Sequence, residues 1–287
     1  MLKRSGCIRL AVVLTAVLAL SSVAFAQEGG QGGGQRPTPT PEQSAARAAR
    51  AAAKAASKKQ PFDPHDLNGV WLSEKLENPN TGVPPRTPAG EAAFKLNKPA
   101  IGSGDRNGAV PLVESNDPIH VCDPPGFPRN LITIVRAIQF VQTKNQMIQL
   151  FLFNEIWRII WTDGRAPMKD EDAQGLPRWS GYSVGHWDGD TFVVETNGLD
   201  ERSWLDSYGD PHSDVATFEE RWHRVDHDTM ELSMTITDPK MYTKPWVVPT
   251  ELFDLQPELD LRQQEICTPS EMAHYQKVIV DPEAIKK

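Results

Sequence analysis

The chain has 287 residues, of which 39% are hydrophobic and 24% are charged, a composition typical of a globular domain with a hydrophobic core. Its formal net charge is −8, but residues 1–26 carry three basic residues and no acid, and residues 27–60 carry a surplus of four basic residues. Residues 61–287 therefore hold about −15. Such an acidic body repels phosphate backbones, which excludes nucleic acid as a partner.

Residues 1–26 have the pattern of a secretory signal peptide. A basic start ends at Arg9, an apolar run extends from Leu10 to about Leu20, and small residues end at Ala26. The apolar run has roughly half of the ~20 residues that span a bilayer, so a membrane anchor is the weaker alternative. We expect cleavage after Ala26, export to the periplasm or the medium, and a mature chain that does not span the membrane.

Cleavage removes Cys7 and leaves Cys122 and Cys267 as a pair. In an oxidising compartment one disulfide between them is the simplest arrangement, and it closes a loop of about 145 residues. Two buried free thiols are the alternative. Catalytic thiol chemistry is not expected, because neither cysteine belongs to a CxxC pair or stands beside a histidine.

A tether precedes the folded domain. Residues 27–43 consist mainly of Gln, Gly, Pro and Thr, which is typical of a flexible linker. Residues 44–59 are rich in Ala with spaced Arg and Lys, which favours a helix that has no apolar face beyond alanine. We therefore predict a disordered or partly helical tether over 27–60 and a single domain over 61–287.

The first part of the domain is mostly irregular. Residues 66–72 indicate a turn that enters a first strand. The stretch from 78 to 128 is rich in Pro, Gly and Asn, and it contains one short predicted helix over 86–96. Thr87 is the expected N-cap of this helix and Pro88 its first residue.

From Leu131 onward the pattern is that of successive strands separated by turns rich in Asp, Asn and Gly. Alternation is clear in 229–237, where Met230, Leu232, Met234 and Ile236 share one face. Hairpins without intervening helices predict an all-β fold, an antiparallel meander that closes into a lipocalin-like barrel of about 8–10 strands, with a two-sheet sandwich as the alternative. The predicted strands cover 131–142, 146–153, 155–162, 179–187, 191–197, 215–225, 229–237, 245–255 and 259–267.

The sequence supports neither a serine-hydrolase motif nor a metal-binding histidine motif. Residues 181–185 match G-x-S-x-G, but a nucleophile elbow needs a following helix, and the next residues predict a strand that enters a hairpin. The seven histidines form neither HxH nor HExxH, so the sequence predicts no metal site and no cofactor.

Charged residues within predicted strands are the main indication of chemistry. Charges are depleted from strands, and a charge among aromatics must be paired or face water. Alternation places Glu220 on one face and Arg221 on the other. If one face lines a cavity, its charges can orient a polar ligand or transfer protons; the alternative is a solvated face with cross-strand ion pairs. His212, in the loop sequence PHSD, is a candidate general base. The candidate catalytic residues are His212, Glu220, Arg221, Arg158 and Asp163.

Aromatic residues near these charges and in the loop before 245–255 are candidates to wall a small-molecule pocket. The candidate ligand-binding residues are Trp157, Tyr182, Trp222, Tyr242 and Trp246.

Six motifs stand out in the domain: CDPPGFPR (122–129), TDGR (162–165), YSVGHWDGDTFVVET (182–196), PHSD (211–214), ERWHRVDHDT (220–229) and ITDPKMYTKPW (236–246). Together they resemble a widespread group of uncharacterised secreted bacterial proteins. The resemblance covers most of residues 62–275 and implies no activity. The opening Asn68-Gly69-Val70-Trp71 also resembles the Gly-x-Trp start of lipocalin-like barrels.

Lipocalin-like architecture implies a cup for small apolar ligands, and some barrels of this kind are cyclases, isomerases or hydratases. We therefore expect a protein that binds a small, partly apolar metabolite in a central cavity. The alternative is a cofactor-free isomerase, lyase or hydratase/cyclase that uses the His, Glu and Arg candidates. A structural or envelope interaction module is the third possibility, and the sequence leaves the question of catalysis open.

Overall fold

The structure is a computed structural model that describes residues 40–73, 82–100, 110–111, 114–133, 137–169, 178–259, 267–275 and 277. The predicted signal peptide and nearly all of the predicted strand 259–267 lie outside the described residues. Of the chain's two compact units, Met1–Ala46 and Arg47–Lys287, the second contains the barrel. No helix in the described ranges is long and apolar enough to cross a membrane.

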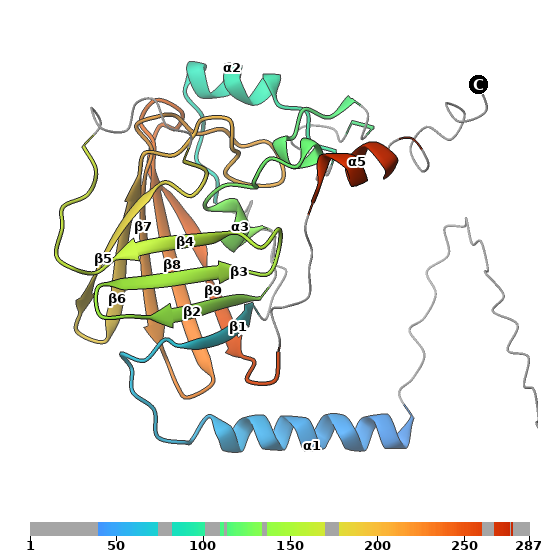
Figure 1. Cartoon of the computed structure of the whole chain (residues 1–287), viewed down its shortest axis with the longest axis vertical. Helices are drawn as coiled ribbons and strands as arrows, with labels where there is room; N and C mark the ends of the chain where they lie inside the picture. The colour runs from blue at the N-terminus through green and yellow to red at the C-terminus, as the bar shows by residue number, and fades with distance from the viewer. Residues whose placement is uncertain are drawn as a thin grey trace, which may run out of the picture. The chain divides into compact units, whose positions relative to one another are not determined.

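Nine strands form a closed barrel in which every strand pairs with its neighbours in the sequence and β1 pairs with β9 (Figure 1). This confirms the predicted all-β barrel. The strands are β1 (Gly69–Ser73), β2 (Ile138–Gln142), β3 (Gln146–Phe151), β4 (Trp157–Trp161), β5 (Tyr182–Asp188), β6 (Thr191–Asn197), β7 (Thr217–Arg224), β8 (Thr229–Thr237) and β9 (Trp246–Leu255).

One pair departs from the predicted antiparallel meander. β4 and β5 run parallel, with Ile160 opposite Ser183, so the barrel is mixed. Parallel neighbours require the chain to return along the sheet before the second strand begins. The connection between the two strands spans residues 162–181.

The predicted strand 131–142 is wrong in its first part. Residues Arg129–Ile132 form the short helix α3, and β2 begins only at Ile138. All four residues of α3 are buried, so this single turn contacts the protein on every side. A short apolar run that is buried all round does not distinguish a strand from a helix by periodicity.

The predicted helix over 86–96 is present as α2 (Pro88–Leu96). Its N-cap is Thr87, whose Oγ1 accepts the Gly90 backbone N–H at 3.0 Å. Gly90 is required by close packing, because a Cβ there would lie 2.1 Å from the Met241 carbonyl oxygen. The described residues also include the helices α1 (Pro41–Ser57), the 3-10 helix η2 (Pro118–Val121) and α5 (Pro269–Tyr275).

Residues 41–57 of the predicted tether form the helix α1, and the last turn of this helix and the residue just after it pair with the barrel. Lys54 pairs with Asp254 of β9, and Lys58 Nζ lies 3.7 Å from an Asp226 carboxylate oxygen. These pairs tie the end of the Ala-rich segment to the turn between β7 and β8 and to β9.

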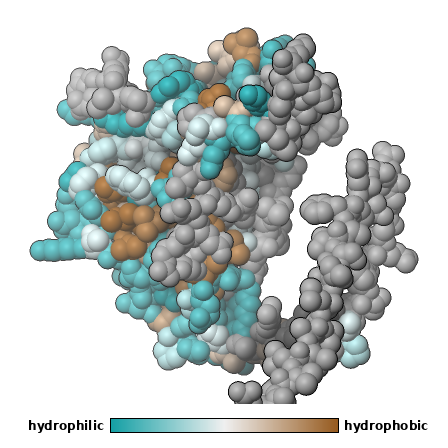
Figure 2. All heavy atoms as spheres, turned by 45° about the vertical axis from the view of Figure 1, so that its right-hand side comes forward, coloured by the Kyte–Doolittle hydropathy of each residue, from teal (hydrophilic) through white to brown (hydrophobic). Residues whose placement is uncertain are grey.

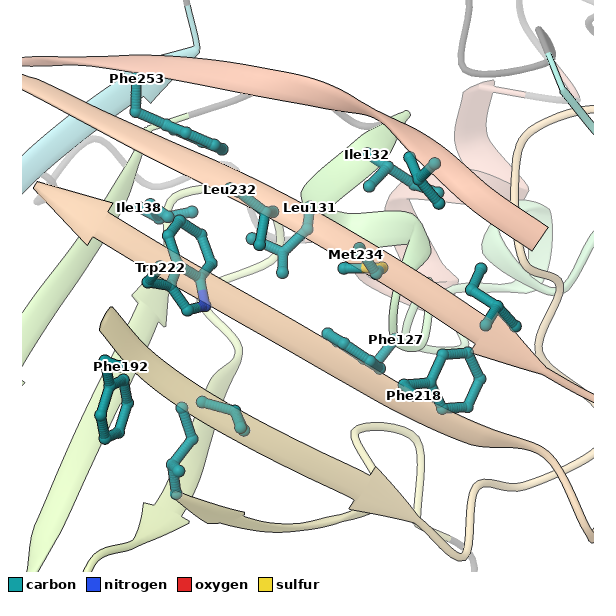
Figure 3. Packing of buried hydrophobic residues seen from close by; sticks show 14 of the residues in the cluster. Phe127, Leu131, Ile132, Ile138, Phe192, Phe218, Trp222, Leu232, Met234 and Phe253 are labelled. Carbon is teal, nitrogen blue, oxygen red and sulfur yellow. The ribbon is translucent and has the colours of Figure 1, made fainter. Parts of the chain in front are cut away.

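The barrel interior is filled by inward-facing side chains of its own strands and by side chains of the segment that precedes β2. Phe127, Leu131 and Ile132 are at most 2% exposed and belong to the core cluster. Figure 3 shows them among inward-facing residues of β7, β8 and β9, including Trp222 and Met234. This segment therefore packs inside one end of the barrel and buries much of its own apolar surface there.

A disulfide joins Cys122 to Cys267, with a Cα–Cα distance of 5.3 Å, as predicted. Cys122 directly follows η2, and Cys267 lies just before α5. The bond therefore fastens the C-terminal segment to the loops that cover one end of the barrel.

The outer face of the sheet is not uniformly polar. Figure 2 shows a hydrophobic patch among hydrophilic residues on the face turned to the viewer. On the outward side of β4, Trp157 is 61% exposed. Ile159 and Trp161 of the same strand are only half-buried.

Candidate functional site

The first polar cluster lies inside the barrel. Arg158 of β4 and Glu220 of β7 are almost fully buried, and Arg158 Nη2 donates to Glu220 Oε1 at 2.5 Å. Arg158 Nε also donates to Ser183 Oγ at 3.1 Å, and Trp222 Nε1 donates to Glu220 Oε2 at 3.1 Å. Ser183 is thus a strand residue within the G-x-S-x-G sequence, and β5 continues into a hairpin as the sequence predicts.

This interior cluster is enclosed by packing. The Arg158 guanidinium lies over the Phe127 ring, 4.2 Å from its centroid. Gln149 of β3 stands opposite Arg158 in the register and is fully buried. Its side-chain amide and Arg158 Nη1 have no hydrogen-bond partner among the described residues. Burying two charges is costly unless they are paired, so Arg158 and Glu220 each need the other to stay in the core.

The second polar cluster lies at a pocket of about 500 Å³, which we call the mouth pocket. The pocket lies between α2, η2 and the loops that follow β6 and β8. Two apolar side chains on its wall are well exposed, Leu96 at 71% and Val121 at 65%. Its lining residues are Ala93, Leu96, Asn97, Asn116, Pro118, Val121, Asp123, Glu201, Arg202, Ser203, Trp204, Pro211, His212 and Met241.

A serine and a histidine meet in the wall of this pocket. Ser203 Oγ lies 2.8 Å from His212 Nε2, and both residues are at most 2% exposed. His212 Nδ1 lies 3.3 Å from the Ser213 carbonyl oxygen. Burial lowers the pKa of His212, although the carboxylates of Asp238, Glu201 and Asp200 oppose that shift. The imidazole is therefore held in its neutral form at neutral pH.

A network behind His212 fixes its orientation. Asp238 accepts hydrogen bonds from the Ser213 backbone N–H at 2.6 Å and from Ser213 Oγ at 2.8 Å. Asp238 also accepts the backbone N–H of Met241 at 3.1 Å. The carbonyl that faces His212 is thereby tied to the loop that supplies Met241 to the pocket wall.

Two buried aspartates brace the loop between Ser203 and His212. Asp206 Oδ1 accepts the backbone N–H of Tyr208 at 2.9 Å and of Asp210 at 3.0 Å. Burial, together with the neighbouring Asp210 carboxylate, raises the pKa of Asp206 to about 8. Arg86 Nε donates to Asp210 Oδ1 at 3.1 Å. These contacts hold Ser203 and His212 at the two ends of one ordered loop.

A second pocket of about 340 Å³ lies on the outer side of β6, β7 and β8. Its lining includes the register partners Glu195 and Glu219 and several threonines. None of the predicted site residues lines it, so the mouth pocket is the stronger candidate site.

The five predicted catalytic residues fall into three places. His212 lines the mouth pocket, whereas Arg158 and Glu220 pair with each other in the barrel interior. Arg221 points outward and donates to Asp188 Oδ2 at 2.9 Å. Asp163 pairs with Arg165 on the surface, and this pair lowers the pKa of Asp163. Among the described residues, no hydrogen bond joins His212 to Arg158 or Glu220.

The five predicted ligand-binding aromatics are not among the residues that line the two pockets. Trp157 is on the outer surface, and Trp222 and Trp246 are fully buried in the core. Tyr242 is buried and donates to the Pro211 carbonyl oxygen at 2.9 Å, which places it directly behind the pocket wall. Tyr182 is half-buried at the start of β5.

Sequence reasoning missed Ser203. It considered Ser213 and Asp214 beside His212, but the hydroxyl that reaches the imidazole comes from nine residues earlier. The available signal was a loop sequence, Gly198 to Asp214, that contains three serines, one histidine and five acidic residues between two strands. Such a loop is a common place for binding groups, but its sequence does not show which side chains meet.

Within the described residues there is no group of three or more His, Cys, Asp and Glu side chains placed to hold a metal ion. In comparisons with known proteins, no family model matches the chain, and neither does any curated protein or any solved structure.

Proposed function

We propose that this protein is exported and binds a small, partly apolar molecule in the mouth pocket. A single observation carries the proposal: a hollow of about 500 Å³ whose wall combines the exposed side chains of Leu96 and Val121 with the buried pair of Ser203 and His212. Pockets of this size and mixed lining suit small organic ligands.

We propose the mouth pocket and not the barrel interior as the binding site, because core side chains fill the interior. Phe127 and Leu131 are almost fully buried among the inward-facing residues. Asp123 and Glu201 line the mouth pocket, and Arg202 is already paired with Asp200. This charge distribution favours neutral ligands over anionic ones.

Export is supported by the signal-like residues 1–26 and by the disulfide between Cys122 and Cys267. Disulfides persist in oxidising compartments and are rare in the cytosol of most cells. Mass spectrometry of the protein recovered from the periplasm or medium should give a chain that begins at Gln27. A chain retained in the cytosol with Met1 intact would contradict export.

Binding is tested by ligand-dependent thermal shifts over a panel of neutral and anionic short-chain esters, amides and aromatic acids. A compound that binds the folded state raises the melting temperature, and the rise grows with the logarithm of one plus its concentration over Kd. Val121→Asp should reduce the shift, because it places a charge in the apolar part of the pocket wall. The matched control is Val225→Asp, since Val225 is also exposed but does not line the pocket.

The outcomes separate clearly. The proposal is supported if Val121→Asp raises the apparent Kd from the thermal shifts at least about tenfold. Val225→Asp should leave that Kd unchanged. If no compound in the panel shifts the melting temperature, or if both variants weaken binding equally, the mouth pocket is not the binding site.

A further inference from the structure

Ser203 and His212 have the local geometry of a nucleophile and its base. A carbonyl oxygen can only accept, so the contact between His212 Nδ1 and the Ser213 carbonyl places the imidazole proton on Nδ1. Nε2 then carries a lone pair directed at Ser203 Oγ, 2.8 Å away. The Asp200 carbonyl, 3.0 Å from the same oxygen, is a second acceptor for the hydroxyl hydrogen.

The backbone of the loop opposite packs closely against Ser203 at Gly126. A Cβ at Gly126 would lie 2.4 Å from Ser203 Cβ and 2.8 Å from Ser203 Oγ, and Gly126 has φ +77°. Glycine is therefore required here both by its backbone conformation and by the close approach to Ser203. Any larger residue at this position would clash with the serine and displace it from His212.

His212, the candidate base, is oriented by the Ser213 carbonyl and, through Ser213, by Asp238. Binding of a ligand alone does not require such an arrangement. Ser213, whose carbonyl faces His212, is held by two hydrogen bonds to the buried Asp238. A base held by a third group beside a hydroxyl is the arrangement that activates serine for covalent catalysis.

We infer that Ser203 is the nucleophile and His212 the general base of an esterase site in the mouth pocket, acting on neutral carboxylic esters with a short apolar group. This inference rests on the proposed function, because the ester must first bind in that pocket. Leu96, Val121 and Trp204 supply the apolar surface for the alkyl part.

The reaction proceeds in two balanced halves. Ser203 Oγ attacks the ester carbonyl carbon while its proton passes to His212 Nε2. The bond between the carbonyl carbon and the alcohol oxygen breaks, and the alcohol leaves with that proton, so that the acyl group is bound to Ser203. Water then attacks the acyl carbon and gives a proton to His212, which returns it to Ser203 as the acid is released.

The test uses the mature chain with its disulfide intact and 4-nitrophenyl acetate and butyrate as substrates. We expect turnover that Ser203→Ala and His212→Gln each lower at least about 100-fold. The matched control is Ser207→Ala, a half-buried serine in the same loop that does not line the pocket. Melting temperatures of all variants check that the fold is retained.

A second readout does not depend on the choice of ester or on variants that fold. An alkyl fluorophosphonate should add one phosphonyl group to the wild-type protein, and peptide mass spectrometry should place it on Ser203. Turnover that survives Ser203→Ala, or wild-type protein with neither turnover nor an adduct on Ser203, would overturn the inference. Ligand-dependent thermal shifts that persist in that case would leave the proposed binding function intact.

Discussion

The pair of Arg158 and Glu220 in the barrel interior and the pair of Ser203 and His212 at the mouth are both almost fully buried, yet their surroundings differ. Arg158 and Glu220 carry opposite charges and are enclosed by Ser183, Trp222 and the Phe127 ring. Ser203 and His212 are uncharged at neutral pH and form part of a pocket wall. Burial of polar groups is therefore no sufficient sign of function in this molecule; the open space beside them distinguishes the two pairs.

The difference also explains how the two pairs are held. Strand alternation and register fix Arg158 and Glu220, because β4 and β7 each place one residue in two inside the barrel. A loop fixes Ser203 and His212, and it needs the buried Asp206 and Asp238 to keep its shape. The interior pair belongs to the framework, whereas the mouth pair depends on a scaffold of local hydrogen bonds.

The largest effect is expected from Glu220→Ala, which leaves Arg158 buried without its partner. Removing one member of a buried ion pair costs about 3–5 kcal/mol of unfolding free energy. Urea unfolding measures this loss. The matched control is Glu219→Ala, whose side chain points outward from the same strand and should change stability by less than about 0.5 kcal/mol. Equal effects at the two positions would show that the interior pair is not structural.

Removal of the disulfide should come next. Cys122→Ser with Cys267→Ser frees a loop of 145 residues in sequence separation, and loss of a native disulfide costs about 2–5 kcal/mol. Because Val121 and Asp123 flank Cys122 in the wall of the mouth pocket, the double variant should also bind ligand more weakly. Unfolding curves and ligand-dependent thermal shifts of the oxidised wild type and of the double variant measure the two effects. Unchanged ligand binding would show that the disulfide does not shape the pocket.

Asp206→Asn should give a smaller effect that depends on pH. The pKa of Asp206 is raised to about 8 in the fold, whereas an unfolded aspartate has a pKa near 3.9. Between these values the folded state holds a proton that the unfolded state has lost, so stability falls as the pH rises from about 4 to 8. Asparagine does not titrate, so it removes this loss of stability with rising pH. It also keeps an oxygen that can accept the backbone N–H groups of Tyr208 and Asp210.

The variant should therefore become more stable relative to the wild type by up to a few kcal/mol between about pH 5 and pH 8. Urea unfolding at both pH values measures the difference. A difference between variant and wild type that stays constant over this range would argue that Asp206 is ionised in the folded protein.

Much of the barrel was predictable because its strands obey a simple period. Met230 to Ile236 alternate with polar residues, and the structure places them inward as that alternation requires. The same rule placed Glu220 and Arg221 on opposite faces of one strand, and the structure turns Glu220 inward and Arg221 outward. The parallel pairing of β4 with β5 was not predictable this way, because alternation within a strand does not reveal the direction of its partner. The helix α3 was not predictable either, because a four-residue helix buried on all sides carries no periodic signal.

The mouth pocket was only half predictable. His212 was a reasonable candidate because it lies in a polar loop, but its contact with Ser203 is made by the path of that loop. The path depends on hydrogen bonds that Asp206 and Asp238 accept and on the close approach of Gly126. The contacts of Asp238 and Gly126 join residues from separate parts of the chain, so no local pattern encodes them.

The most direct test of the difference between interior and mouth is an NMR spectrum of the tryptophan indole N–H groups. It is recorded with and without the panel compound that gives the largest thermal shift. Each of the eight tryptophans gives one signal, and Trp204→Phe and Trp222→Phe assign the two that matter. Trp204 lines the mouth pocket, whereas the Trp222 indole donates to Glu220 in the interior. The proposed binding site predicts that the Trp204 signal moves on saturation while the Trp222 signal stays; movement of Trp222 with Trp204 unchanged would place the ligand inside the barrel and contradict it.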